Sequence, residues 1–207
     1  MIRRAVLESL RRSTTKALVS RFVENFSTVI LKERSISLKP PGTSRLISTN
    51  IIFAATTKRK YQFFQNVEVT STGVAIIRFD NPDKKVNTIS FALKDEAEIL
   101  WNNEIHSNPL VKAVVFTSGK HDSFIAGADI FDIQRLNNKE EIIPLIKSAT
   151  VFFKKMKRKG VPLVCAINGP ALGGGLEWCL WCDYRICTDN PKTKLGLPEV
   201  KLGLLPG

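Results

Sequence analysis

The stretch from Ala166 to Glu177, which reads A-I-N-G-P-A-L-G-G-G-L-E, decides how this chain folds. It joins the apolar run 161–167, which has the length and composition of a buried strand, to a segment with one apolar helix face. An Asn-Gly-Pro tripeptide breaks the strand, and three consecutive glycines precede the helix. The sequence therefore predicts a strand that delivers the chain through glycines to the start of a helix.

The glycines Gly173, Gly174 and Gly175 suit a backbone that binds a ligand. Glycine lets backbone N–H groups approach a ligand closely, and the first amides of a helix have no partner inside it. A carbonyl oxygen that gains negative charge could be held there, helped by the helix dipole. Glu177 falls in the first turn, where the dipole alone favours a carboxylate. This stretch therefore leaves a structural and a catalytic role for Glu177 equally open.

Two further segments add to this pattern. Residues 124–130 read F-I-A-G-A-D-I, an apolar run that ends in a glycine turn, and Asp129 is placed to cap a following helix. Residues 195–207 read L-G-L-P-E-V-K-L-G-L-L-P-G, in which Glu199 follows a proline among apolar neighbours. A carboxylate in such a position can serve in acid–base chemistry. The chain thus offers two turns that carry amides and two candidate acid–base carboxylates.

Hydrophobic periodicity predicts the surrounding elements. Residues 67–69 and 74–79 are typical of strands joined by a Ser-Thr-Gly turn, and residues 111–117 are typical of another buried strand. Apolar residues at helical spacing predict a helix over 93–101. A second, longer helix follows, in which Pro144 is expected to confine the regular part mostly to later residues. Strands and helices in this order predict an α/β fold built from repeated ββα units.

The motifs A-G-A-D-I, N-G-x-A-L-G-G-G-L-E and P-E-V-K-L-G-L-L-P-G occur in this order and at intervals that resemble the enoyl-CoA hydratase (crotonase) superfamily. Within it, K-V-N-T-I-S at 85–90 and K-T-K-L-G-L-P-E-V at 192–200 are most similar to the alpha-subunit family of the mitochondrial trifunctional protein. The resemblance covers about residues 61–207. It implies a crotonase-like spiral of ββα repeats, incomplete at the C-terminus, and a partial hydratase domain.

The resemblance also implies a site. The backbone amides of Ala128 and Gly174 would hold the thioester oxygen of a trans-2-enoyl-CoA. Glu177 would take a proton from water, and Glu199 would deliver a proton to the alpha carbon, which gives a 3-hydroxyacyl-CoA in fatty acid beta-oxidation. A long acyl chain is implied. Substrate contacts are expected from the neighbouring residues Ala126, Gly127, Asp129, Gly173 and Gly175.

Three alternatives to hydration stay open. Superfamily members that only shift a double bond commonly use one carboxylate, so the pair Glu177 and Glu199 favours a hydratase over an isomerase. An inactive subunit that assembles with partners is the second, because the superfamily continues with further helices beyond Gly207. The third is an RNA-binding protein on the same fold, since residues 154–159 read K-K-M-K-R-K. No interleaved aromatic residues accompany this run, which makes nucleic acid a disfavoured partner.

The four cysteines do not form a recognisable metal motif. Cys179, Cys182 and Cys187 begin as C-x2-C, but no second C-x2-C or His pair follows, so we expect no metal site. Small buried residues are the better interpretation of these three cysteines. No permanently bound cofactor is expected either, and coenzyme A would enter only as the carrier of the substrate.

Positive charge is concentrated at the start of the chain. The formal net charge is +12, and residues 1–60 contribute most of it, with arginines and serines but few acids. This pattern is typical of a mitochondrial transit peptide followed by a disordered leader, and it predicts a mitochondrial location. The resemblance adds partners: the chain itself or a thiolase-type beta subunit, and the surface of the inner mitochondrial membrane.

Overall fold

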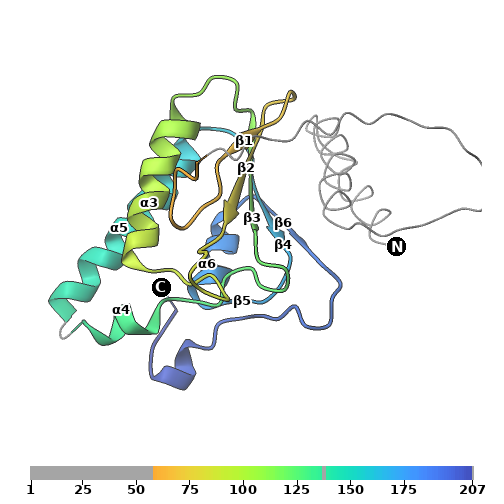
Figure 1. Ribbon diagram of the computed structural model, residues 1–207. Coiled ribbons are helices and arrows are strands. Elements are labelled where there is room, and N and C mark those ends of the chain that lie inside the picture. The colour runs from red at the N-terminus through yellow and green to blue at the C-terminus, as the bar shows by residue number, and fades with distance from the viewer. Residues whose placement is uncertain (1–57, 137–138, 207) are drawn as a thin grey trace, which may run out of the picture. The chain divides into compact units, whose positions relative to one another are not determined.

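The computed structural model describes residues 58–136 and 139–206, all within a compact unit that runs from Ala54 to Gly207. The predicted leader lies almost wholly outside the described residues, so its boundary near residue 60 stays a prediction. The described unit is built on a five-stranded sheet with the order β1-β2-β3-β4-β6 (Figure 1). These strands are β1 (Glu68–Val69), β2 (Val74–Phe79), β3 (Ala113–Ser118), β4 (Leu163–Ile167) and β6 (Tyr184–Cys187).

The sheet is parallel except at one edge. β1 pairs antiparallel with β2 across a turn that contains Gly73, which has a φ of 86°, and this confirms the predicted hairpin. β2, β3, β4 and β6 pair in parallel. The central strands read VAIIRF, AVVFTS and LVCAI and are buried almost throughout, as near-continuous apolar runs in parallel sheets commonly are. Their carboxyl ends therefore meet at one edge.

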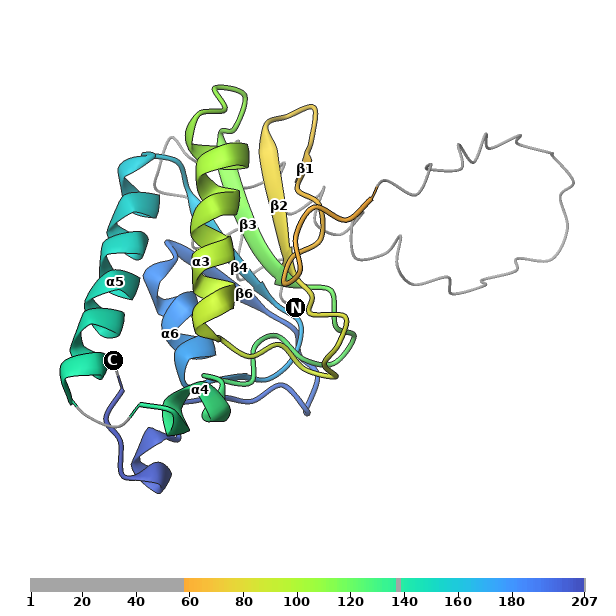
Figure 2. The same ribbon diagram turned by 60° about the vertical axis from the view of Figure 1, so that its left-hand side comes forward.

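Helices cross over between the parallel strands and cover one face of the sheet (Figure 2). Buried side chains of α3, α5 and α6 pack against the alternate strand residues that point to that face, such as Ile77 and Phe79 of β2. The helical elements are α3 (Phe91–Leu100), the π-helix η2 (Trp101–His106), α4 (Ile130–Gln134), α5 (Lys139–Arg158), α6 (Gly174–Trp181) and the 3-10 helix η3 (Glu199–Leu202).

An aromatic cluster anchors α6 on the sheet. The ring of Trp178 meets those of Phe79 and Phe116 edge to face, with centroids 5.0 and 5.5 Å apart. Phe153 of α5 lies 5.1 Å from Trp178 in the same manner. Because Trp178 directly follows Glu177 in the chain, the packing of this ring also fixes where the first turn of α6 lies.

A second, smaller sheet joins the two motifs that flank α6. β5 (Ala171–Leu172) pairs in parallel with β7 (Leu195–Gly196). This pairing places the glycine turn beside the segment that begins η3. The element order and the mainly parallel sheet confirm the predicted α/β architecture.

The structure confirms most of the prediction for the long helix and extends the helix forward. α5 begins at Lys139, five residues before Pro144, and its longer part, up to Arg158, follows the proline as predicted. Proline removes one backbone donor, but the apolar face of α5 packs on the core, and tertiary packing rather than local propensity supplies most helical stability.

Gly175 determines how closely α6 approaches the neighbouring loop. A Cβ at this position would lie 2.4 Å from the carbonyl oxygen of Ile125 and 2.8 Å from its Cβ, distances that no side chain tolerates. Gly175 is buried. Its geometry assigns it to backbone packing, whereas the sequence predicted a substrate contact.

We expect Gly175→Ala to lower the free energy of unfolding by about 1–3 kcal/mol, because the added methyl group must push α6 away from Ile125. Chemical denaturation would measure this. Gly196→Ala is the matched control, since a Cβ there would meet only Leu172 Cδ2 at 3.8 Å, an ordinary contact. Equal stability of the two variants would contradict this account.

Candidate functional site

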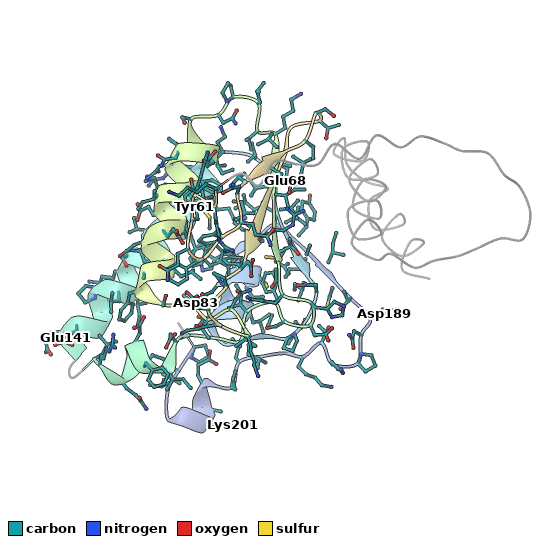
Figure 3. All side chains as sticks on the ribbon, in the orientation of Figure 1. Tyr61, Glu68, Asp83, Glu141, Asp189 and Lys201 are labelled. Carbon is teal, nitrogen blue, oxygen red and sulfur yellow. The ribbon has the colours of Figure 1, made fainter. Side chains whose placement is uncertain are left out.

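The candidate site lies where the central parallel strands end. Segments that leave the carboxyl ends of β2, β3 and β4 converge there, as ligand-binding segments of parallel α/β sheets commonly do. In Figure 3, Asp83, in the loop after β2, and Lys201, on η3, lie toward this lower end of the sheet, whereas Glu68 lies near the upper end.

The first turn presents the amide of Ala128. Ile89 forms a parallel bridge with Ala128: its N–H donates to the Gly127 carbonyl at 2.8 Å, and its carbonyl accepts from Asp129 N at 2.8 Å. Alternate groups of an extended chain point to opposite sides, so the Ala128 N–H points away from Ile89. Among the described residues it donates to no protein acceptor. Ala128 is exposed, and a bound molecule could reach this amide.

The second turn presents the amide of Gly174. Gly173 is the N-cap of α6, with φ 51° and ψ −129°, a conformation open to glycine. Its carbonyl accepts from Leu176 N at 2.8 Å and Glu177 N at 3.0 Å, which starts the helix. Gly174 N follows as the first helical amide and has no acceptor among the described residues.

The two turns and the two carboxylates meet in one place. A Cβ built on Gly174 would lie 3.6 Å from Glu177 Oε2 and 4.0 Å from Ala128 N. A Cβ built on Gly173 would lie 2.8 Å from Glu199 Oε1. Amides and carboxylates from three distant parts of the chain therefore surround one small volume. The structure brings together Ala128, Gly174, Glu177 and Glu199, as the sequence predicted.

Glu199 carries the clearest sign of a site built for a ligand. Its Oε2 is buried and has no hydrogen-bond partner among the described residues. The pairing of β5 with β7 delivers it, through the bond from Gly173 N to the Gly196 carbonyl at 2.9 Å. A buried carboxylate oxygen without a partner is costly unless something that binds there supplies the hydrogen bond.

Asp129 supports the first turn from inside the protein. Its side chain is buried and caps α4, since Oδ1 accepts from Phe131 N at 3.1 Å, which confirms the predicted cap. Oδ2 accepts from Thr88 Oγ1 and pairs with the ammonium of Lys84. The hydrogen bond from Lys84, together with those from Thr88 and Phe131, lowers the pKa of Asp129 below its usual 3.8. These internal contacts engage both oxygens of its side chain, and the substrate contact of Asp129 stays a prediction.

Asn87 is a functional residue that the sequence reasoning missed. Its side chain is 1% exposed. Its Nδ2 donates to the carbonyls of Phe79 and Phe124 at 3.0 Å and to Ser118 Oγ at 2.9 Å. The backbone carbonyl of Asn87 accepts from Ala126 N at 2.8 Å. Asn87 thus ties the ends of two strands to the turn that carries Ala128. The available signal was its position within the motif K-V-N-T-I-S, directly before the residues that pair with the Ala128 turn.

The basic run 154–159 is largely engaged within the protein. Lys155 pairs with Glu98 at 3.3 Å, and Lys157 pairs with Asp183. Lys159 Nζ donates to the carbonyls of His106 and Asn108, each at 3.0 Å. Three of the five cations are therefore held by α3, by the end of η2 and the turn after it, and by the residue that precedes β6.

The cysteines follow the prediction only in part. Cys179 and Cys182 are buried, but Cys187 is exposed, so the expectation of a third buried cysteine was wrong. Over residues 58–136 and 139–206 no group of three His, Cys, Asp or Glu side chains is arranged to hold a metal ion. In the same residues no helix has the length and apolarity needed to cross a bilayer.

The fold and the site define a class of α/β protein in which two backbone amides and two carboxylates face one volume. This chain belongs to the enoyl-CoA hydratase/isomerase family, which it matches over residues 69–207. The structure is similar to that of an enoyl-CoA hydratase from Bacillus anthracis, with a TM-score of 0.62 and 29% identity, over 70% of this chain and 54% of that one.

Curated relatives share the same region of the chain. The fatty acid oxidation complex subunit alpha of Idiomarina loihiensis is 48% identical over 141 residues, which are 68% of this chain and 20% of that protein. The subunit of the same description from Shewanella frigidimarina is 43% identical over 143 residues, 69% of this chain and 20% of that protein. The chain therefore spans about a fifth of the length of these relatives.

The mitochondrial location predicted from the basic leader is wrong. The two relatives above and three more from Vibrio and Aliivibrio are bacterial, and bacteria have no mitochondria. A basic segment poor in acids is a feature of composition, which does not specify an organelle. The predicted transit peptide and the predicted association with the inner mitochondrial membrane both depend on this location, so they are not supported either.

We expect ionised Asp129 to stabilise the fold. A carboxylate whose pKa is lowered on folding adds stability above its unfolded pKa, and this stability is lost as pH falls through the folded pKa. The thermal midpoint should therefore fall as pH is lowered below about 4. It should fall less steeply in Asp129→Asn, which keeps the helix cap but cannot ionise. Parallel slopes for the two proteins would contradict the assignment.

Proposed function

We propose that this chain adds water to the double bond of a trans-2-enoyl-CoA and forms a 3-hydroxyacyl-CoA, a hydration step of fatty acid beta-oxidation. The observation that carries the proposal is the convergence of two amides without protein acceptors and two carboxylates on one volume. Membership of the enoyl-CoA hydratase/isomerase family and similarity to fatty acid oxidation subunits support it.

The amides of Ala128 and Gly174 would bind the thioester oxygen. Addition of water at the beta carbon pushes electrons toward this oxygen, which takes on the charge of an enolate. Both donors then bind it more strongly than in the ground state, which is what accelerates the step. Loss of one such donor typically costs about 2.7 to 4 kcal/mol of transition-state stabilisation.

The two carboxylates would divide the proton transfers. Glu177 accepts a proton from the attacking water, whose hydroxyl group bonds to the beta carbon. Glu199 delivers a proton to the alpha carbon. Transfer of a proton from Glu177 to Glu199 by way of solvent then restores both side chains, so that the elements of one water are added in total. The buried Oε2 of Glu199, which lacks a protein partner, is suited to hold that water before the reaction.

Two observations favour hydration over isomerisation and over RNA binding. An isomerase needs to move one proton and can do so with one carboxylate, whereas Glu199 enters this site as a second carboxylate beside Glu177. RNA binding through the basic run 154–159 is less favoured, because Lys155, Lys157 and Lys159 bind the protein itself.

The substrate carrier and the partners follow from this function. Coenzyme A would enter with each acyl group and leave with the product, and no permanently bound cofactor is required. Assembly with copies of itself or with a thiolase-type beta subunit is proposed from the relatives, which are described as subunits of a fatty acid oxidation complex.

A long acyl chain is also proposed. Two large apolar side chains that are close in the chain to site residues are exposed: Phe131, which is 71% exposed, lies three residues after Ala128, and Val200, which is 76% exposed, follows Glu199. Exposed apolar surface beside a polar site is suited to a long hydrocarbon chain.

We expect Glu177→Gln and Glu199→Gln each to lower kcat by about 100-fold or more, because an amide cannot exchange the proton. Loss of the ultraviolet absorbance of the conjugated enoyl thioester would measure turnover. Glu140→Gln, a change of the same kind at an exposed position on α5, should leave kcat unchanged. Absence of turnover in the unchanged chain, or full turnover in both site variants, would contradict the proposed function.

We expect Phe131→Ala to lower kcat/KM for a long trans-2-enoyl-CoA by about tenfold and to affect a short one little, because only the long chain reaches this ring. Leu110→Ala is the control, since Leu110 is 69% exposed but precedes the amino end of β3, away from the site. Equal losses for both chain lengths would count against a long-chain preference.

A further inference from the structure

A buried negative charge lies directly beside one of the amides that face the site. Asp129 follows Ala128 in the chain, and its carboxylate is only 6% exposed. Covalent bond lengths alone keep this carboxylate within about 9 Å of Ala128 N. A charge at this distance acts strongly on a site nearby, since a buried charge is screened much less than one in water.

This charge opposes the chemistry of the site. An oxygen that becomes an enolate at Ala128 gains negative charge, and the carboxylates of Glu177 and Glu199 already lie around it. A further uncompensated carboxylate at Asp129 would raise the free energy of the transition state. The structure places a cation on it: Lys84 Nζ pairs with Asp129 Oδ2 from the loop that follows β2.

We propose that Lys84 is a positioning residue that acts on the enolate oxygen through Asp129, by cancelling the field of its carboxylate at the Ala128 amide. The inference rests on the proposed function. In this inference Asp129 has a structural role, because it caps α4 and binds Thr88. Its negative charge would hinder catalysis, and Lys84 removes that electrostatic cost.

The contacts of Asp129 separate the two tasks. The bond from Phe131 N reaches Oδ1 at 3.1 Å, and the single oxygen of an asparagine could accept it. The bond from Thr88 Oγ1 reaches Oδ2 at 3.1 Å, where asparagine would carry Nδ2, and the Thr88 hydroxyl can turn to accept from that group. The pairing with Lys84 depends on charge. Asp132, on α4, and Arg135, the C-cap of α4, pair with one another at 3.9 Å.

The test is a set of four variants of the full chain, assayed with a trans-2-enoyl-CoA. Lys84→Met leaves the buried carboxylate uncompensated and should lower kcat about tenfold with little change in KM. Lys84→Met combined with Asp129→Asn removes both charges and should restore kcat to within about twofold of the unchanged chain. Asp129→Asn alone should leave kcat equal or higher. Lys85→Met, a change of the adjacent exposed lysine, is the control.

A second measurement tests the electrostatic effect of Lys84 on a bound enolate and does not require turnover. Acetoacetyl-CoA loses its alpha proton to form an enolate that absorbs in the near ultraviolet. At a fixed pH, the bound enolate fraction should fall in Lys84→Met and return in the double variant. A residue that merely held the turn in shape would not produce this recovery.

The outcomes distinguish the inference from the function beneath it. Turnover in the unchanged chain, together with a double variant as slow as Lys84→Met or slower, would overturn the role of Lys84 and leave the hydratase intact. A Lys84→Met variant whose kcat equals that of the unchanged chain would also overturn the role of Lys84. An unchanged chain with neither turnover nor an enolate signal would overturn the proposed function, and the inference with it.

Discussion

The close contact between the N-terminus of α6 and the backbone of Ile125 is the constraint on which the site depends. Only glycine at position 175 permits it, since any Cβ would lie 2.4 Å from the Ile125 carbonyl. The contact brings two turns from different strands together, so that the amides of Ala128 and Gly174 face the same volume. Packing of Trp178 against Phe79 and Phe116 holds α6 in this position from the core side.

Buried polar groups make the loops of the site rigid. Asn87 satisfies three acceptors from the ends of β2 and β3 and from the loop after β3, and Asp129 satisfies the start of α4. Backbone donors gain most when they are held in place before the charge develops, because no reorganisation is then needed. These two side chains therefore serve the amide of Ala128 without facing the site themselves.

Charge sets a second condition on the site. In the proposed reaction Glu177 and Glu199 transfer protons, yet they stand near the oxygen that becomes negative. Asp129 adds a third carboxylate for structural reasons, and Lys84 pairs with it. In this proposal the polar loop after β2 influences the chemistry although its lysine is 43% exposed at the surface.

Several interpretations depended on what lies opposite a residue, which a linear pattern does not contain. The run 154–159 has the composition of a binding patch, but Glu98, Asp183 and two carbonyls meet its lysines. Cys187 was predicted to be buried like Cys179 and Cys182, yet it lies exposed on the edge strand β6. Local propensity predicts that a helix is broken at a proline such as Pro144. α5 nevertheless continues through it, because the apolar face of the helix packs on the core.

Local periodicity and turn residues in the sequence determined the central strands, the hairpin, the order of the elements and the cap at Asp129. The four residues at the centre of the site came from the resemblance of the sequence motifs to a known family. Tertiary structure alone decided that β5 pairs with β7 and so places Glu199 beside Gly173, that Asn87 joins two strand ends, and that Lys84 neutralises Asp129. Each of these joins residues that are far apart in the chain, and only the packed sheet and helices set their distance.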